Sequence, residues 1–293
     1  PLPDCLLPPR SSSTMRTVMS VALAIAFGYV LLVGLMFAFQ DRLLFQPDSR
    51  ISRTPDALGM PYDTVRIDTG DGETLHGWWI PSASARPLRG TLLFFHGNAG
   101  TIAGRLENAR QFHRMGLNVL LFDYRGYGKS TGTPSEDGLY RDAEAAWTWL
   151  ADTRSVAPSD ITIFARSMGG GPASWLAVRT DPRAVILESV FTSVPDVAAH
   201  HYPFVPVRWL ARTRFDVLSR VPDLLAPLLV IHSRADRVVP FAHGRQLYEA
   251  AAEPKRFLEI DGGHNDGFWV SRQRYTRAIQ EFLDEAGGVE RHP

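Results

Sequence analysis

The chain has 293 residues, of which 45% are hydrophobic and 21% are charged, and its 31 basic and 31 acidic residues give a formal net charge of zero. This length suits one large domain with an appendage, and the balanced charge gives no electrostatic reason to expect a nucleic-acid partner. Cys5 is the single cysteine, which excludes an internal disulfide and a cysteine-based zinc site.

The first predicted element is an apolar segment from Val18 to Phe39 that contains no charged residue. At a rise of about 1.5 Å per residue, a helix of this length covers a hydrocarbon core of about 30 Å. The alternative is a cleaved signal peptide, whose apolar core is about 7–15 residues long and precedes a small-x-small cleavage site. The run here is longer, and Met36-Phe37-Ala38 is a poor site. We therefore expect an uncleaved transmembrane anchor at residues 18–39, after a tail at residues 1–17.

The flanking charges leave open the side of the membrane on which the rest of the chain lies. Arginines occur both before and after the apolar segment, so neither flank has the clear excess of positive charge that would predict the cytoplasmic side. These arginines are Arg10, Arg16, Arg42, Arg50 and Arg53. The sequence also leaves open whether Met15 is the true start, with residues 1–14 read through from upstream.

Beyond a linker at residues 40–61, short apolar runs alternate with amphipathic stretches from residue 62 to residue 286. Several runs, such as TLLFF and LLVI, are continuously apolar, as in strands that are covered on both faces. Strands are predicted at residues 64–67, 74–80, 91–95, 118–122, 161–164, 184–187, 228–231 and 257–260. Helices are predicted at residues 102–115, 138–151, 168–179, 241–252 and 270–285. This order predicts an α/β domain with a mainly parallel sheet covered by helices on both faces, joined by an antiparallel hairpin of the first two strands.

Residues 192–226 interrupt this alternation. The stretch HHYPFVPVRWLARTRFD places Tyr202, Phe204, Trp209 and Phe215 among prolines and arginines. Because such an insertion follows a strand, we expect it to form a lid over whatever lies at the carboxyl edge of the sheet.

The segment FARSMGG follows the strand at residues 161–164 and contains Ser167. A serine hydroxyl is a poor nucleophile until a base takes its proton. A sharp strand-to-helix turn lifts the hydroxyl out of the sheet edge and aims helix N-terminal amides at the developing oxyanion. Such a turn needs small residues two positions before and two after the serine, here Ala165 and Gly169. The motif A-x-S-x-G therefore predicts Ser167 as a nucleophile.

Two later strands are followed by residues that complete a catalytic triad. PLLVIHSRADRVVP delivers Asp236, and RFLEIDGGHNDGFW delivers His264. Taken alone, a histidine in a Gly-Gly-His loop is more often structural, and an aspartate after a strand is usually a turn former or a helix cap. The order Ser167, Asp236, His264, with each residue at the carboxyl end of a strand, is the order of alpha/beta-hydrolases. We therefore predict this triad.

An oxyanion hole is predicted from two backbone amides. LLFFHGNAG closes the strand at residues 91–95, and the amide of Asn98 after it can point at a substrate oxygen. The amide of Met168, the residue after the nucleophile, is its predicted partner, and single donors of this kind are worth about 10²–10³ in rate. His96 comes too early in the chain to be the base, and we expect its imidazole to hydrogen-bond the backbone of the turn.

These motifs together resemble the alpha/beta-hydrolase-domain group of membrane-anchored serine hydrolases, which includes relatives of the protein depalmitoylases. The segments that carry the resemblance are FFHGNAG, DYRGYGKSTGTPSEDGLYRDAEAAWTWL, ARSMGG, LESVFTSV, HSRADRVVP, GGHND and, after the apolar segment, RLLFQP. The resemblance extends over residues 40–285 and implies the alpha/beta-hydrolase fold. Ala165 departs from the more usual glycine, which bears on the geometry of the turn. The resemblance implies Ser167 as nucleophile, His264 as general base and acid, and Asp236 as orienting acid. It also implies the Asn98 and Met168 amides as oxyanion donors.

Three further charged residues compete for a role near the predicted site. Glu188 also follows a strand and is the rival to Asp236 as the acid of the triad, although we favour Asp236. Asp123 ends a strand but precedes the serine, so we expect it to brace a loop. For Arg166 we expect a surface role ahead of a contact with the lid or with an anionic substrate group.

The sequence as a whole predicts a membrane-anchored serine hydrolase that cleaves ester or thioester bonds through an acyl-enzyme, without a metal or organic cofactor. The anchor and the aromatic insertion favour a lipid-like or acylated substrate. The alternatives are a serine peptidase on the same fold and a non-catalytic membrane-tethered binding protein. The acyl-chain length, the leaving group and the oligomeric state are left open.

Overall fold

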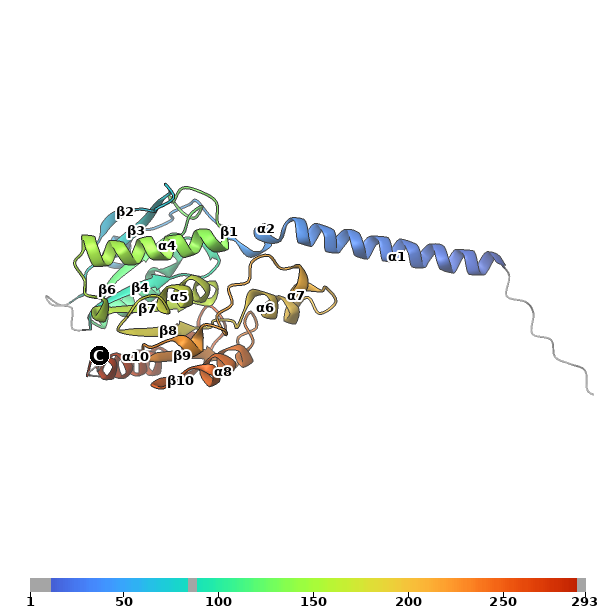
Figure 1. Cartoon of the computed structure of the whole chain (residues 1–293). Coiled ribbons are helices and arrows are strands. Elements are labelled where there is room, and N and C mark those ends of the chain that lie inside the picture. Colours follow the sequence, from blue (N-terminus) through green and yellow to red (C-terminus); the bar gives the residue numbers. More distant parts are fainter. Residues whose placement is uncertain (1–11, 84–88, 289–293) are drawn as a thin grey trace, which may run out of the picture. The chain divides into compact units, whose positions relative to one another are not determined.

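The computed structural model describes residues 12–83 and 89–288, and the chain divides into two compact units (Figure 1). The first unit ends at Leu43 and the second begins at Leu44. The five-residue helix α2 (Gln40–Leu44) lies at this boundary.

The first unit contains one long helix, α1 (Ser12–Ala38). The most apolar 18-residue stretch within Thr14–Ala38 has a mean hydropathy of 2.5, and none of that stretch is buried. Within the described residues, α1 is the one helix long and apolar enough to cross a membrane. The predicted anchor at residues 18–39 overlaps it, whereas residues 1–11 of the predicted tail lie outside the described residues.

The second unit is built on an eight-stranded sheet with the strand order β10-β9-β8-β7-β4-β6-β3-β2. The pairs from β10 to β6 are parallel, and β2 and β3 form an antiparallel hairpin that joins the sheet at β6. The predicted parallel sheet with an added hairpin is therefore confirmed. The strands are β2 (Asp63–Asp68), β3 (Thr74–Ile80), β4 (Thr91–Phe95), β6 (Asn118–Phe122), β7 (Ile161–Arg166), β8 (Ala184–Glu188), β9 (Leu228–Ser233) and β10 (Lys255–Ile260).

Helices cover both faces of this sheet, as predicted. Their apolar side chains divide into two clusters, because successive residues of a strand point to opposite faces. Leu93 and Phe95 of β4 join the cluster that contains side chains of α4 and α5. Leu92 and Phe94 join the cluster that contains side chains of α3 and α10. The helices are α3 (Leu106–Arg114), α4 (Glu136–Thr148), α5 (Gly170–Ala177), α6 (Val194–His201), α7 (Val207–Leu210), α8 (Phe241–Ala250), α9 (Gly267–Val270) and α10 (Arg272–Gly288).

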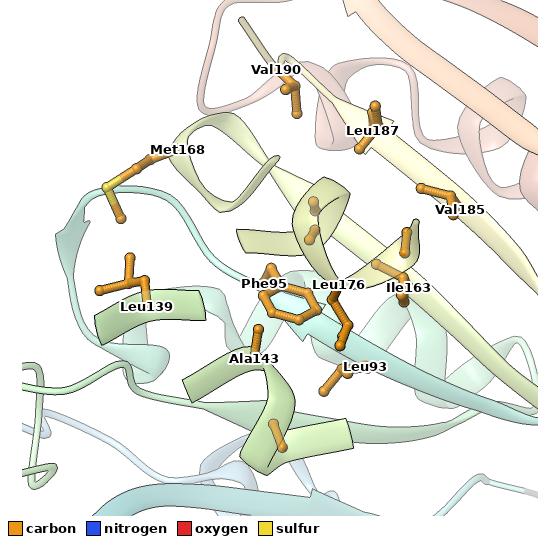
Figure 2. Packing of buried hydrophobic residues seen from close by; sticks show 14 of the residues in the cluster. Leu93, Phe95, Leu139, Ala143, Ile163, Met168, Leu176, Val185, Leu187 and Val190 are labelled. Carbon is orange, nitrogen blue, oxygen red and sulfur yellow. The ribbon is translucent and has the colours of Figure 1, made fainter. Parts of the chain in front are cut away.

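The first cluster reaches the carboxyl edge of the sheet. Figure 2 shows Phe95 of β4 packed between Leu176 of α5 and Ala143 of α4, with Met168 at the edge of the same cluster. Met168 is 1% exposed, although it follows the predicted nucleophile directly. The turn after β7 is therefore anchored in the hydrophobic core.

The predicted insertion at residues 192–226 has two dissimilar halves. Its first half carries α6 and α7, and there Phe204 is 87% and Trp209 is 90% exposed. Its second half is part of the core: Phe215 is fully buried, and its backbone N–H donates to the Glu136 carboxylate at 2.8 Å. The prediction that Phe215 belongs with the aromatic residues of a lid is wrong, because its ring is buried and packs edge-on against Tyr140 of α4.

Candidate active site

Ser167 occupies a sharp turn between β7 and α5. Its φ is +52°, a left-handed conformation that is uncommon for a residue with a side chain and costs roughly 1–3 kcal/mol. The turn is one residue from the end of β7, and a short 3-10 turn at Ser167–Gly169 leads into the helix. Ser167 is largely buried, with 9% of its surface exposed. This is the strained strand-turn-helix geometry that raises a nucleophile above a sheet edge.

Gly169 allows the turn to lie directly against β4. A Cβ atom at this position would come within 2.4 Å of the Phe95 carbonyl oxygen and 2.7 Å of the His96 carbonyl oxygen. Both are backbone atoms at the end of a central strand and cannot move aside. Ala165, the departure from the usual glycine, is fully buried within β7 and pairs with Phe95 of β4. Its methyl group is therefore accommodated inside the sheet.

Asp236 lies on the loop after β9 and is held by two backbone amides. Its Oδ1 accepts hydrogen bonds from the N–H of Val238 at 2.9 Å and of Val239 at 2.8 Å. Its Oδ2 is 2.7 Å from His264 Nδ1. Burial alone would raise the pKa of the Asp236 carboxyl, but the hydrogen bonds from His264 and from these amides hold the pKa below its usual value. Asp236 is therefore an anion at neutral pH and can only accept a hydrogen bond.

His264 lies on the loop after β10 with its ring oriented by Asp236. Because the carboxylate accepts, Nδ1 carries the proton, and Nε2 on the opposite side of the ring is the basic nitrogen. The loop is ordered by Gly263, whose N–H donates to Asp266 Oδ1 at 2.6 Å. Among the described residues, no hydrogen bond joins Ser167 Oγ to His264. Such contacts are commonly long in ligand-free enzymes and shorten when substrate binds.

Arg166 connects the predicted nucleophile turn to the histidine loop. Its Nη2 donates to the backbone oxygen of His264 at 2.5 Å, and its Nε is 3.5 Å from Glu188 Oε1. The hydroxyl of Tyr275 on α10 donates to Glu188 Oε2 at 2.6 Å. Arg166 is 3% exposed, so the expected surface role is wrong. The guanidinium instead forms a buried bridge between the ends of β7 and β8 and the loop that carries His264.

The same contacts separate the two candidate acids. Glu188 directs its two oxygens to Arg166 and Tyr275, whereas Asp236 contacts the His264 ring. Asp123 also has a different task, because its Oδ1 accepts the N–H of Ile102 at 2.9 Å in the loop after β4. Of the three carboxylates, Asp236 is the one that contacts the His264 ring.

His96 fixes the peptide group that contains the Asn98 N–H. Its Nδ1 donates to the carbonyl oxygen of Gly97 at 2.7 Å, in agreement with the backbone contact expected from the sequence. The Gly97 C=O and the Asn98 N–H belong to one planar trans peptide and point in opposite directions. Burial, with a smaller contribution from Arg105, lowers the pKa of His96 to about 3. The ring is therefore a neutral donor, and it directs the Asn98 N–H away from itself.

Among the described residues, no group of three or more histidine, cysteine, aspartate or glutamate side chains is placed to hold a metal ion. A groove of about 1030 Å³ lies over β2 and α4, where Asp71, Arg141 and Trp149 line it. None of its lining residues belongs to the predicted triad or oxyanion hole.

Two structural contributions to the site were missed in the sequence. The first is the bridge formed by Arg166, whose position next to Ser167 in FARSM was the available signal. The second is the segment Leu44–Asp48, which contacts the loop at Asn98 and was expected to be a linker. Its signal was Phe45, an apolar residue that directly follows the short helix α2 and is 3% exposed.

Comparison with known proteins gives three kinds of match. The family model Hydrolase_4, described as serine aminopeptidase, S33, matches residues 86–216. An uncharacterized protein of Mycobacterium tuberculosis is 38% identical over 92% of this chain and 94% of its own length. The alpha/beta hydrolase domain-containing protein WAV2 of Arabidopsis thaliana is 32% identical over 90% of this chain and 94% of its own length. Among solved structures, an esterase of Pyrococcus furiosus has a TM-score of 0.70 at 23% identity, covering 83% of this chain and 98% of that chain.

Proposed function

Because the chain belongs to the alpha/beta-hydrolase family, we propose that it is a serine hydrolase that cleaves carboxylic ester or thioester bonds through an acyl-enzyme intermediate. The observation that carries this proposal is the 2.7 Å hydrogen bond from His264 Nδ1 to Asp236 Oδ2. That bond leaves Nε2 as the basic nitrogen, on loops at the same sheet edge as the Ser167 turn. The three expected residue types follow parallel strands in the expected order, which supports the proposal.

In the proposed mechanism, His264 Nε2 takes the Ser167 proton as Oγ attacks the substrate carbonyl carbon. The new C–O bond gives a tetrahedral oxyanion that accepts hydrogen bonds from the Asn98 and Met168 amides. The C–O or C–S bond then breaks, and the leaving alcohol or thiol receives the proton from His264. Water, activated by the same imidazole, attacks the acyl-enzyme and releases the acid. Asp236 holds the imidazole in its reactive tautomer and stabilises its cationic form.

We further propose that α1 anchors the enzyme in a membrane and that the substrate is lipid-like or acylated. The support is the mean hydropathy of 2.5 over the most apolar 18 residues within Thr14–Ala38 and the exposure of Phe204 and Trp209 in the insertion. Exposed aromatic residues of this size are typical of surfaces that contact apolar ligands or lipid. The proposal predicts that the full chain on phospholipid vesicles prefers long-chain over short-chain esters. Equal turnover of both chain lengths would remove its basis.

A serine peptidase is the second candidate, because the family model that matches residues 86–216 is described as a serine aminopeptidase. The two activities share the nucleophile and differ in the leaving group. Parallel assays with p-nitrophenyl esters and with aminoacyl p-nitroanilides distinguish them. The main proposal predicts that ester turnover exceeds anilide turnover by more than the intrinsic difference in reactivity between p-nitrophenyl esters and p-nitroanilides. A peptidase would make this difference smaller.

The test of the proposal is covalent labelling with a fluorophosphonate probe. The wild-type chain should be labelled and the Ser167→Ala variant should not. Ser189→Ala is a matched control, since Ser189 follows the neighbouring strand β8 and has the same φ of +52°. It should be labelled as wild type is. Equal labelling of wild type and Ser167→Ala would show that a residue other than Ser167 reacts, and no labelling of either protein would favour a tethered binding protein over an enzyme.

A further inference from the structure

The segment that follows the apolar helix is bonded to the loop that carries the predicted oxyanion donor. We call residues Leu44–Asp48 the strap. The strap contains β1 (Gln46–Pro47), which pairs in parallel with β5 (Ala99–Gly100) directly after Asn98. This two-stranded sheet is separate from the main sheet. Its hydrogen bonds therefore connect the strap to the loop at Asn98 and not to the central strands.

Two hydrogen bonds join the strap to Asn98 itself. The Gln46 N–H donates to the Asn98 carbonyl oxygen at 3.1 Å, and the Asn98 side-chain Nδ2 donates to the Leu44 carbonyl oxygen at 2.9 Å. Tyr127 adds a third bond, from its hydroxyl to the Asn98 carbonyl oxygen at 2.8 Å. The Asn98 N–H, in contrast, donates to no other group in the described parts of the chain. The residue is thus fixed through its carbonyl and side chain while its amide stays available.

The strap is itself firmly attached to the second unit. Phe45 is 3% exposed and packs edge-on against Phe215, with ring centroids 6.3 Å apart. At the far end of the strap, the Gly128 N–H donates to the Asp48 carbonyl oxygen at 2.8 Å. These contacts give the strap a fixed position from which to hold Asn98.

We propose that the strap positions the Asn98 amide for the developing oxyanion, so that the first residues of the second unit are a working part of the active site. This inference rests on the proposed serine-hydrolase function. His96 sets the peptide plane on the N-terminal side of Asn98, and the strap sets the plane on its C-terminal side. With both planes held, the N–H direction is preorganised before substrate arrives, which is the condition for effective oxyanion stabilisation.

The expected loss of kcat follows from the proposed role of the strap in positioning the Asn98 amide. Removing a single oxyanion donor typically costs about 10²–10³ in kcat, and a misplacement of about 1 Å can cost about 10². Loosening the strap leaves the donor present but misdirected. We therefore expect a loss of kcat of roughly 10- to 100-fold, with KM nearly unchanged, because the contact strengthens only in the transition state.

The variant that tests this in the full chain is Gln46→Pro, which removes the N–H that donates to Asn98. The conservative Gln46→Ala variant keeps this N–H and should restore most of the lost kcat. Ser52→Pro is the control for proline itself, because Ser52 lies in an exposed loop and its N–H makes no hydrogen bond among the described residues. Each protein is assayed with a p-nitrophenyl ester and with phenylboronic acid. The boronic acid forms a tetrahedral anion on serine and so reports on the oxyanion hole.

The expected result is a parallel change in two constants. In Gln46→Pro, kcat/KM should fall and the inhibition constant of phenylboronic acid should rise by the same factor, with KM within about twofold of wild type. An unchanged inhibition constant in a folded Gln46→Pro protein would overturn the proposal. Where Gln46→Pro does not fold, Asn98→Ala decides, because it removes the bond to Leu44 and keeps both backbone groups. It should lower kcat and weaken boronic acid binding together, and no change in either would again overturn the proposal.

Amide hydrogen exchange separates this proposal from the function on which it rests. Exchange in the peptide covering residues 96–101 should rise in Gln46→Pro and not in Ser52→Pro. If wild type neither hydrolyses esters nor reacts at Ser167, but this exchange still rises, the strap holds the loop and the proposed function is wrong. If exchange is unchanged and the wild type is an active hydrolase, the strap does not position the loop.

Discussion

The two loops that flank Ser167 are held in place by different physical means. The loop with Asn98 is held by neutral hydrogen bonds from the strap, His96 and Tyr127, and by aromatic packing. The loop with His264 is held by charged groups, namely Asp236 on its ring and Arg166 on its backbone. Neutral hydrogen bonds contribute about 1 kcal/mol each, whereas hydrogen bonds to charged groups contribute about 1.5–3 kcal/mol. Loss of Arg166 would also leave Glu188 buried without its cation, at about 3–5 kcal/mol. The histidine side should therefore be the more sensitive of the two to single substitutions.

The largest expected effect distinguishes the two acids on the histidine side. Asp236→Asn should lower kcat by about 10⁴, because the amide no longer fixes the reactive tautomer of His264. Glu188→Gln should lower kcat far less, since Glu188 does not touch the imidazole. Steady-state kinetics of the two variants decide the matter. A larger loss in Glu188→Gln would exchange the roles of the two carboxylates.

The next effect concerns Arg166. Arg166→Met should destabilise the folded chain by about 3–5 kcal/mol, because Glu188 is left buried without its cation. The double variant Arg166→Met with Glu188→Leu removes both charges and should regain part of this stability. Its kcat should remain lower by about 10-fold or more, since nothing then holds the backbone oxygen of His264. Urea unfolding and kinetics measure the two quantities separately.

A double variant with recovered stability and wild-type kcat would contradict this expectation. The contact between Arg166 and the histidine loop would then serve stability alone. The comparison between the two loops would lose its charged side, and only Asp236 would remain as the group that orients the base.

A smaller effect is expected on the neutral side. Tyr127→Phe removes one of the two donors to the Asn98 carbonyl oxygen and leaves the Gln46 N–H in place. We expect a loss of about 0.5–1.5 kcal/mol in the free energy of unfolding and a fall in kcat of less than about 10-fold. A loss of kcat as large as that of Asp236→Asn would show that the neutral side is no less sensitive than the charged one.

The last prediction concerns the dependence of stability on pH. The pKa of His96 is about 3 in the folded chain, against an ordinary value of 6.5. Between these values the unfolded chain binds a proton that the folded chain does not, so stability falls as the pH is lowered from 6.5. The slope from this group is at most about 1.4 kcal/mol per pH unit. His96→Gln should reduce the slope measured by urea unfolding between pH 4 and pH 6.5, and equal slopes would contradict the assignment.

Much of the fold could be predicted because its strands are buried on both faces. The ends of apolar runs such as TLLFF and NVLLF predict the ends of the strands. Both β4 and β6 begin and end at the predicted residues. The candidate triad could be predicted for a related reason. Residues directly after parallel strands gather at one edge of the sheet, so Ser167, Asp236 and His264 could be placed there from order alone.

The supports of the site could not be predicted in the same way. Arg166 reads as a surface residue until Glu188 and Tyr275 are known to lie beside it, and these partners come from distant parts of the chain. The strap pairs through only two residues, Gln46 and Pro47, which leave no periodic pattern. Phe215 reads as a lid aromatic because composition does not reveal that Glu136 binds its backbone. Contacts between distant segments have no local signature.

The most direct test of the central claim is to identify the residue that becomes acylated. The full chain is mixed with a p-nitrophenyl ester, quenched in acid within the first turnover, digested and analysed by mass spectrometry. The account predicts an acyl group on the peptide that contains Ser167, and its absence from Ser167→Ala. Ester hydrolysis by the wild type with an adduct on a different serine, or undiminished hydrolysis by Ser167→Ala, would contradict it.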